Sequence, residues 1–306
     1  MRRAKLLAIG LLSAVLLAGC GADLDISISD NKATVNQTTY FTPSEKEAMK
    51  DTSDLQLEEV ERNGTTYYAN KQSKTLSKEE FRENGVGIFT DKYVALAVAN
   101  GLDFYDVTLT TPFKIVAGNG TFAGDNSMKF DYSSVGGRPQ HDSQDIYYAT
   151  ADEALLHGED ITVTGVKDSG KYKAAKTIKY RSDDGIVKSV AVTSNGRTDY
   201  SDPTTGEVYL SGTGKYNIEF TLVGGKKSNM TVWIDTDKPK ANVSNNGVYS
   251  KGKKLTFSDK GTGLKSATLD GKTVKSGKKL TKAGSHRLVL TDKAGNKTTI
   301  RFTVKK

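Results

Sequence analysis

Apolar and polar residues alternate along most of this chain, a pattern typical of β-strands that bury one face. The alternation is clean over residues 23–29, which read DLDISIS, and it continues over residues 33–41. Further along, LEEVER and TTYYAN flank Asn63 and Gly64, a dipeptide that favours a tight β-hairpin. The pattern therefore predicts a protein that is mainly β.

Two short helices are predicted among the strands of the first half. The stretches TPSE at 42–45 and SKEE at 77–80 each place a hydroxyl residue three positions before a glutamate, the signature of a capping box. Gly85 supplies a stop for the second helix, because glycine adopts the left-handed backbone conformation that ends many helices. Strands combined with two short helices predict an α+β domain over residues 20–158.

The second half of the chain contains an internal repeat. Residues 170–192 align without a gap with residues 247–269, and residues 214–234 align with residues 284–304. The offset falls from 77 to 70 between the two blocks, so the first copy carries seven extra residues. Both copies alternate apolar and polar residues between turn signals, which predicts two tandem β-sandwiches.

The second copy contains the stretches SDKGTGLKSATLDGK and LTKAGSHRLVLTDKAGNKTTIRFTV. With these it resembles the bacterial immunoglobulin-like domains of surface proteins, and the first copy is similar but diverged. The resemblance implies a spacer, adhesion or binding module without catalysis of its own. Trp233 is expected in a core or at a domain contact, rather than as a stacking platform for sugar.

We therefore predict a mainly β fold, in which the N-terminal α+β domain is followed by two tandem immunoglobulin-like β-sandwiches. The sandwiches are assigned to residues 159–237 and 238–306. The joint between them is placed at DKP, residues 237–239, because proline cannot extend the hydrogen-bonded ladder of the preceding strand.

Within the first domain, residues 105–132 read YDVTLTTPFKIVAGNGTFAGDNSMKFDY. This stretch resembles the LppM-type lipoprotein domain, in which a strand ends in proline, an Asn-Gly turn follows, and the next strand ends in an aromatic residue. Pro112, Asn119, Gly120 and Phe130 would fill those places, with residues 145–149 as the closing strand. The resemblance implies an envelope location and a role with lipids or glycolipids, and it leaves the ligand open.

The N-terminus has a basic start and an apolar run over residues 6–18, the layout of a secretory signal peptide. The run is too short to span a bilayer, which takes about 20 apolar residues. Leu17, Ala18, Gly19 and Cys20 then resemble a bacterial lipobox. The resemblance implies cleavage of residues 1–19 before Cys20 and acylation of its thiol. The alternative is an ordinary signal peptide with a chance cysteine.

Cys20 is the single cysteine of the chain, so no disulfide can form and the exported domains must depend on their cores. The lipobox resemblance implies a protein held on the cell membrane by its acyl chains, on the extracytoplasmic face. The membrane, reached through this lipid anchor, is thus the first expected partner.

Charge is distributed unevenly along the chain. Residues 238–306 hold 18 Lys and Arg against 3 Asp, or +15, whereas residues 20–237 hold 23 basic against 33 acidic residues, or −10. A solvated lysine-rich surface is one reading, and attraction of the basic tip to a polyanion is the other. The lysines predicted to bind a polyanion are Lys251, Lys253, Lys254, Lys278 and Lys279.

Catalytic chemistry is not predicted. The acylated Cys20 is lost as a nucleophile, RPQHDS at 138–143 reads as a polar loop because adjacent residues cannot form a catalytic triad, and no zinc-ligand spacing occurs. The turns at 182–185 and 292–296 lack the spacing of an EF-hand loop. Asp23 and Asp25 share one face of a strand and are expected to face water rather than a cation. We predict no enzyme activity, no metal and no cofactor.

Two functions stay open on these grounds. In the first, the protein is a lipid-anchored surface module whose basic tip binds an anionic wall polymer or a surface protein. In the second, the N-terminal domain binds or carries an envelope lipid or glycolipid. Nucleic acid is disfavoured as a partner, because the basic stretch lacks interleaved aromatic residues and any reading-helix motif.

Overall fold

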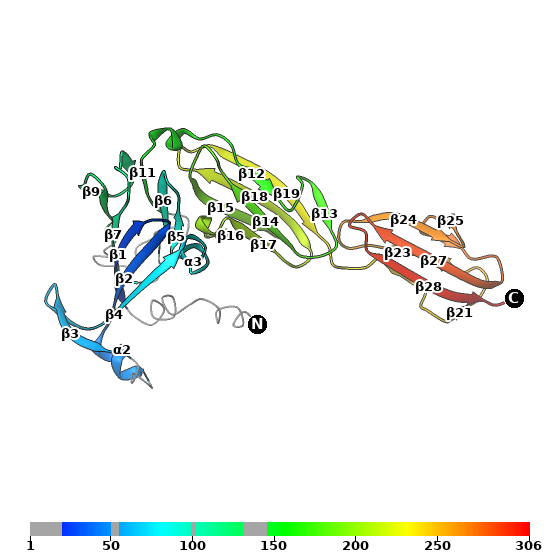
Figure 1. The fold of residues 1–306 in the computed structure, drawn as a ribbon. Coiled ribbons are helices and arrows are strands. Elements are labelled where there is room, and N and C mark those ends of the chain that lie inside the picture. The colour runs from blue at the N-terminus through cyan, green and yellow to red at the C-terminus, as the bar shows by residue number, and fades with distance from the viewer. Residues whose placement is uncertain (1–19, 50–54, 99–101, 131–145) are drawn as a thin grey trace.

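The computed structural model describes residues 20–49, 55–98, 102–130 and 146–306. The predicted fold class is confirmed, because strands make up most of the described chain and the helices are short. Figure 1 shows the elements following one another along an elongated molecule, with β1 and β2 far from the C-terminus. Each sheet takes its strands from within one of the three proposed domains.

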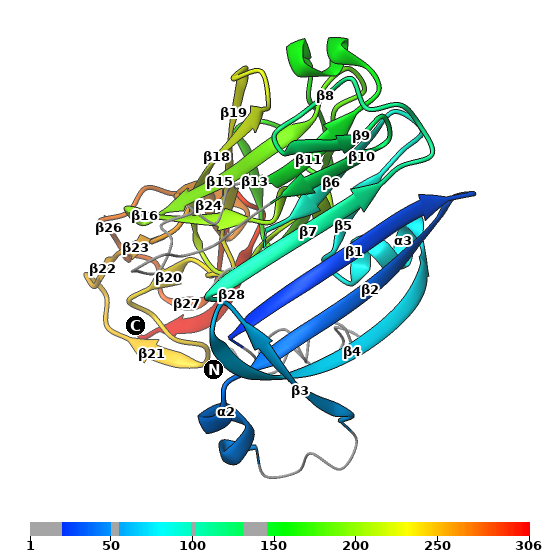
Figure 2. The ribbon, with the colours of Figure 1, turned by 90° about the vertical axis from the view of Figure 1, so that its left-hand side faces the viewer.

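The first sheet has seven strands in the order β3-β4-β2-β1-β7-β10-β9, with β1 and β7 parallel. Its bounds are β1 Gly21–Ser29, β2 Lys32–Phe41, β3 Leu57–Arg62, β4 Thr65–Ser77, β7 Phe104–Thr110, β9 Thr121–Gly124 and β10 Ser127–Phe130. Positive φ angles at Asn63 and Gly64 close the predicted β3–β4 hairpin. Figure 2 shows β4 as a long curved strand that carries β3 at one end of the sheet.

Both predicted helices are present with complete capping boxes. They are α2 (Pro43–Ala48), capped by Thr42 and Glu45, and α3 (Lys78–Glu83), capped by Ser77 and Glu80. The chain leaves α3 through Gly85, which has a φ of +68°. Of the two, α3 is the one that contributes to a core, because its Phe81 is fully buried.

A second sheet of four strands packs against the apolar face of the first sheet. Its order is β5-β6-β11-β8, with bounds β5 Gly87–Phe89, β6 Tyr93–Ala97, β8 Ala117–Gly118 and β11 Ile146–Thr150. Side chains from both sheets and from α3 form one apolar core. The core includes Leu24, Ile26, Val35, Leu76, Phe81, Val94, Leu96, Val107, Leu109, Met128 and Phe130.

The first sandwich consists of a three-stranded sheet, β12-β14-β17, and a five-stranded sheet, β13-β19-β18-β15-β16. Their bounds are β12 Thr162–Thr164, β13 Gly170–Tyr172, β14 Lys176–Arg181, β15 Val187–Ser194, β16 Arg197–Ser201, β17 Glu207–Leu210, β18 Gly214–Leu222 and β19 Lys227–Ile234. Ile178 and Val208 from one sheet meet Ile218 and Val232 from the other in a shared core. Two 3-10 helices, η2 (Glu153–His157) and η3 (Pro203–Thr205), flank these sheets.

The second sandwich has a five-stranded sheet, β21-β28-β27-β24-β25, and two short pairs, β20-β23 and β22-β26. Their bounds are β20 Lys240–Ala241, β21 Gly247–Tyr249, β22 Lys254–Leu255, β23 Phe257–Ser258, β24 Leu264–Leu269, β25 Lys272–Thr273, β26 Lys278–Lys279, β27 Gly284–Asp292 and β28 Lys297–Val304. Leu255, Leu288, Leu290 and Phe302 lie in its core.

The internal repeat corresponds to a repeated topology. The two five-stranded sheets have the same strand order. In each, a short strand at one edge pairs in parallel with the strand that comes last in the chain, β13 with β19 and β21 with β28. The aligned tyrosines also form the same contact: Tyr172 accepts a hydrogen bond from the Lys167 N–H, and Tyr249 accepts one from the Ser244 N–H, both at 2.8 Å.

Trp233 does not lie in a core, which is one of the two places expected for it. Its neighbours Val232 and Ile234 are buried in the first sandwich, so the period of the strand turns Trp233 to the opposite, partly exposed face. There the Lys215 ammonium lies 6.0 Å from the centre of the indole ring.

Several predicted features lie outside the described residues, namely the lipobox residues Leu17, Ala18 and Gly19 and the RPQHDS stretch at 138–143. Within the described part of the chain, no helix combines the length and apolar character needed to span a membrane.

Candidate functional site

The lysines predicted to bind a polyanion gather around one small pair of strands in the second sandwich. They are Lys251, Lys253, Lys254, Lys278 and Lys279. Lys254 on β22 lies directly opposite Lys279 on β26. The Nζ of Lys253 lies 4.4 Å from the centre of the Tyr249 ring, a cation–π contact. We call these five side chains the lysine cluster.

The lysine cluster carries positive charge without internal compensation. Like charges directly opposite each other on paired strands repel, so the Lys254–Lys279 register is unfavourable in isolation. Across residues 238–306, all of which are described, the one ion pair joins His286 to Asp270, and no Lys or Arg is ion-paired. The arrangement therefore favours an external anion.

A second like-charged pair lies on the five-stranded sheet of the same sandwich. Arg287 on β27 is directly opposite Arg301 on β28, and both side chains are exposed. They line a shallow hollow of about 380 Å³, whose other lining residues are Asn246, Asp270, Ser285, His286, Phe302 and Thr303. The sequence gives no sign of this pair, because the two arginines come from separate strands whose register is set by sandwich packing.

His286, beside that hollow, is held by hydrogen bonds within the protein. Its Nδ1 lies 2.6 Å from an Asp270 carboxylate oxygen and its Nε2 lies 2.9 Å from the Lys282 carbonyl oxygen. Burial by itself would raise the pKa of Asp270. Hydrogen bonds from the Arg287 N–H and from His286 outweigh this effect, so the pKa of Asp270 lies below its usual value. Both ring nitrogens are thus engaged by the protein itself, which leaves neither for a substrate.

Cys20 lies directly before β1 and is only 8% exposed. Its Sγ lies 3.4 Å from the Tyr40 carbonyl oxygen, and its N–H donates to the same oxygen at 2.9 Å. Burial, followed by the nearby carboxylates of Glu45 and Asp103, raises the pKa of the thiol to about 12. The free thiol is therefore protonated at neutral pH and is a poor nucleophile in this position. Acylation at Sγ would require the side chain to leave this contact.

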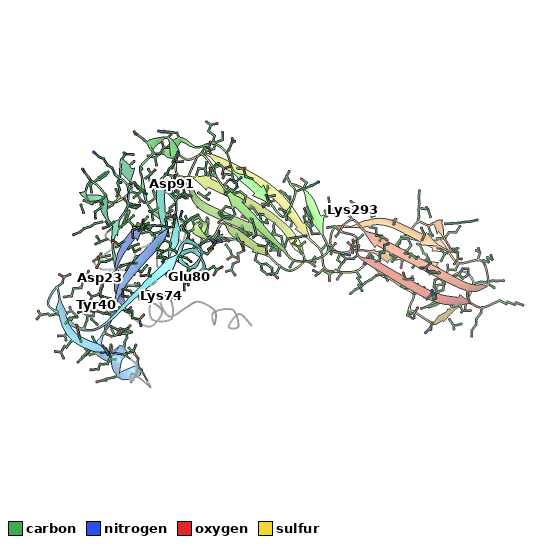
Figure 3. The ribbon with its side chains drawn as sticks, in the orientation of Figure 1. Asp23, Tyr40, Lys74, Glu80, Asp91 and Lys293 are labelled. Carbon is green, nitrogen blue, oxygen red and sulfur yellow. The ribbon has the colours of Figure 1, made fainter. Side chains whose placement is uncertain are left out.

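Close to Cys20, the first sheet carries an ionic and aromatic cluster. Arg62 donates from Nη1 to both carboxylate oxygens of Asp23 at 2.8 Å, and from Nη2 to Asp106. The guanidinium also lies 4.2 Å from the centre of the Phe104 ring, over one face of the sheet. Tyr40 donates to Asp23 at 2.6 Å, and Figure 3 shows these two side chains close together. Asp23 does not simply face water as expected, because Arg62 at the end of β3 reaches it across the sheet, whereas Asp25 is exposed as expected.

One group of carboxylates among the described residues has the geometry to hold a metal ion. One oxygen each from Asp235, Asp259 and Asp292 lie within 4.8 Å of one another. The sequence showed no metal-binding spacing, because these three residues come from three separate segments. Of the three, the sequence singles out Asp292 alone, through the turn DKAGN at 292–296.

Comparisons with known proteins find distant likenesses only. No protein-family model matches the chain. No curated protein matches it either. Among solved structures, it is similar to the folded domain of LppM from Mycobacterium tuberculosis, with 14% identity, a TM-score of 0.29, and coverage of 43% of this chain and 89% of that one.

Two further solved structures cover more of the chain. The four N-terminal Ig domains of a Dscam1 isoform align over 93% of this chain and 73% of theirs, with 10% identity and a TM-score of 0.28. Tp47, a lipoprotein of Treponema pallidum, aligns over 80% of this chain and 69% of its own, with 11% identity and a TM-score of 0.19. At these identities and TM-scores the likenesses assign neither a family nor a function.

Proposed function

We propose that this protein is a non-enzymatic, lipid-anchored protein of the cell surface that binds an anionic polymer through its C-terminal sandwich. The observation that carries the proposal is the Lys254–Lys279 pair, held face to face with no counter-charge from the protein. A chain of phosphate or carboxylate groups bound across the two strands relieves that repulsion. Arg287 and Arg301 offer a second site of the same kind on the same sandwich.

The proposed location rests on the N-terminal residues. Cys20 follows an apolar stretch preceded by basic residues, and it begins the described chain at the first strand. An acylated Cys20 tethers the first sheet to the membrane, and the basic sandwich lies at the other end of the molecule (Figure 1). Since the chain cannot form disulfides, its exported domains would depend on their apolar cores, and each of the three has one of its own.

The test is retention of the intact chain on an immobilised poly(glycerol phosphate) polymer over a range of salt concentrations. Exchanging all five residues of the lysine cluster for glutamine should weaken retention at least about tenfold, since a lysine beside an anionic surface contributes about 1 kcal/mol. Retention of the unchanged protein should fall as salt rises, because ions screen exposed charges.

The matched control removes the same charge from elsewhere in the molecule. Its five exchanges are at Lys32, Lys114, Lys129, Lys171 and Lys173, all of which are exposed. This control should keep most of its retention. If both quintuple variants lose retention equally, net charge alone governs binding and the assigned site is wrong. Retention that does not respond to salt contradicts binding to a polyanion and favours a surface protein as the partner.

A second function is favoured by two buried amides in the N-terminal domain. The Gln37 Oε1 and Asn70 Nδ2 atoms are buried and have no hydrogen-bond partner in the part of the chain that the structure describes, although buried polar groups are normally paired. A polar group of an envelope lipid or glycolipid would satisfy them. Mass spectrometry of lipid that copurifies with the intact chain tests this: bound lipid should be present in the unchanged protein and lost in a Gln37→Leu, Asn70→Leu variant, and a lipid-free protein contradicts it.

A further inference from the structure

Three aspartates meet at the joint between the two sandwiches. Asp235 directly follows β19, the last strand of the first sandwich, whereas Asp259 follows β23 and Asp292 ends β27 in the second. Figure 3 labels Lys293, the neighbour of Asp292, and shows it where the two sandwiches join. One carboxylate oxygen from each aspartate lies within 4.8 Å of the other two. We call this group the joint aspartates.

Backbone and hydroxyl donors hold each carboxylate in place. Asp235 Oδ2 accepts from the Thr262 N–H at 2.6 Å and from its hydroxyl at 2.8 Å. Asp292 Oδ1 accepts from the N–H groups of Gly295 and Asn296 at 2.6 and 2.8 Å. Asp235 and Asp292 have no exposed surface at all. Their positions are therefore determined by the loops around them and not by solvent.

Asp259 supplies an independent indication of a missing ligand. Its Oδ2 accepts from the N–H groups of Gly261 and Gly263, at 3.1 and 2.8 Å. Asp259 is partly buried as a whole, but its Oδ1 atom is buried and has no hydrogen-bond partner among the described residues. A buried carboxylate oxygen without a partner is costly, because it has lost its water and gained nothing in return. Oδ1 can therefore coordinate a cation without giving up a hydrogen bond.

The charge of the group points the same way. No lysine, arginine or histidine forms an ion pair with any of the three aspartates in the described residues. Three carboxylates this close repel one another strongly where water is excluded. The N–H and hydroxyl donors reduce that repulsion without cancelling a net charge. A bound cation would cancel most of it.

We propose that the joint aspartates bind a calcium ion that fastens the second sandwich to the first. The ligands are hard oxygen atoms, which Ca²⁺ and Mg²⁺ prefer over softer metals. Ca²⁺ binds oxygen at about 2.3–2.6 Å, so two of its ligands lie up to about 5 Å apart, whereas the shorter bonds of Mg²⁺ hold them within about 4.2 Å. The three carboxylate oxygens lie within 4.8 Å of one another, which leaves room for calcium. Mg²⁺ suits such a site less well, because it usually keeps several of its waters and binds only one or two carboxylates.

Calcium at this position would connect the two sandwiches through one ion. Asp235 belongs to the end of the first sandwich, and its carbonyl oxygen already accepts from the Asn296 side chain of the second at 2.7 Å. With the ion bound, both halves of the joint share ligands, and the basic sandwich keeps one orientation relative to the rest of the chain. This inference is independent of whether that sandwich binds a polymer.

The experiment uses the intact chain in detergent, stripped of metal with a chelator and titrated with CaCl₂ by calorimetry. We expect one ion bound per chain, with an affinity no weaker than the range of about 10⁻⁴–10⁻³ M seen in extracellular modules, and a melting temperature that rises with calcium. Terbium replaces calcium as a luminescent probe. Trp233, the single tryptophan of the chain, lies two residues before Asp235 and should sensitise it.

Asp259→Asn is the decisive variant. The asparagine carbonyl can keep the hydrogen bonds from Gly261 and Gly263, while the charge and a ligand oxygen are lost. Calcium affinity should fall at least about tenfold, as it does when even an outer partner of a metal ligand is removed. Asp237→Asn is the matched control, because it removes an exposed carboxylate from the same connecting segment and should bind as the unchanged protein does.

A further variant keeps the result interpretable if Asp259→Asn unfolds. Trp233→Phe leaves every joint aspartate in place, so it should bind calcium normally by calorimetry and lose the sensitised terbium signal. Three results overturn the proposal: no calcium binding up to about 10 mM, well above the extracellular range; unchanged affinity in a folded Asp259→Asn; or an equal affinity for magnesium. An unchanged protein that binds calcium but gives no tryptophan-sensitised terbium signal also overturns the location.

Discussion

Arg62 and Asp23, which lie 39 residues apart in the sequence, form a two-pronged ion pair with both N–O distances at 2.8 Å. The pair ties the β3–β4 hairpin to β1, the strand that directly follows the lipidation candidate Cys20. The side chains are 26% and 34% exposed, so water screens the pair only in part. The same guanidinium also contacts Asp106 and the Phe104 ring, and Arg62 is therefore the central residue of this end of the sheet.

Replacing Arg62 with methionine should destabilise the protein. The change leaves Asp23 and Asp106 without their shared cation, and charged hydrogen bonds of this kind contribute about 1–3 kcal/mol to stability. The free energy of unfolding, measured in urea, should fall by about that amount. The control is Arg197→Met, which breaks the Arg197–Asp199 pair on an exposed surface and should cost under about 0.5 kcal/mol. Equal losses in the two variants would show that the cluster has no special role.

The same cluster should make stability depend on alkaline pH. Burial, and then the hydrogen bond to Asp23, raises the pKa of Tyr40 from 10 to about 12. The folded state thus holds the Tyr40 proton at pH values where the unfolded chain has lost it. The stabilisation is complete below about pH 10 and is lost as the pH rises through 12.

Thermal melting between these pH values measures this effect. The unchanged protein should lose melting temperature more steeply than a Tyr40→Phe variant, because phenylalanine has no proton to release. Other buried tyrosines, such as Tyr105 and Tyr180, titrate in both proteins and cancel in the comparison. Identical slopes for the two proteins would contradict the assignment to Tyr40.

The Lys254–Lys279 pair should favour polymer binding and lower the stability of the protein. Lys254→Glu converts a repulsive cross-strand pair into an attractive one, and we expect a gain in stability of about 0.5–1 kcal/mol. Retention on the anionic polymer should fall in the same variant. Lys297→Glu is the control, because the residue opposite Lys297 is Thr291 and no repulsive pair is relieved. A Lys254→Glu protein that is no more stable than this control would show that the like charges cost nothing.

Loss of Cys20 should release the protein from the membrane. Cys20→Ala removes the thiol on which acylation depends. The acyl chains provide the anchoring, because each of their buried methylenes contributes about 0.8 kcal/mol. Labelling with a radioactive fatty acid should mark the unchanged protein and not the variant, and the variant should appear in the soluble extracytoplasmic fraction. An unlabelled wild-type protein that stays inside the cell would rule out the proposed anchor.

Local pattern was enough to predict several elements of the first domain. Alternation predicted β1 and β2, the capping residues Thr42 and Ser77 predicted both short helices, and Asn63 with Gly64 predicted a hairpin. The self-alignment predicted two sandwiches, and the structure repeats one topology in both. These features depend on neighbours within a few residues or on a period along one strand, which a sequence records directly.

Contacts between distant segments were decided by the tertiary structure. The sequence placed Asp23 on a polar face but had no information about the curvature of β4 that brings Arg62 to it. It named Lys254 and Lys279 without their register, and it left Asp235, Asp259 and Asp292 in three unrelated segments. Register and joint geometry follow from how whole cores pack, so charges far apart in the chain become neighbours only when those cores form.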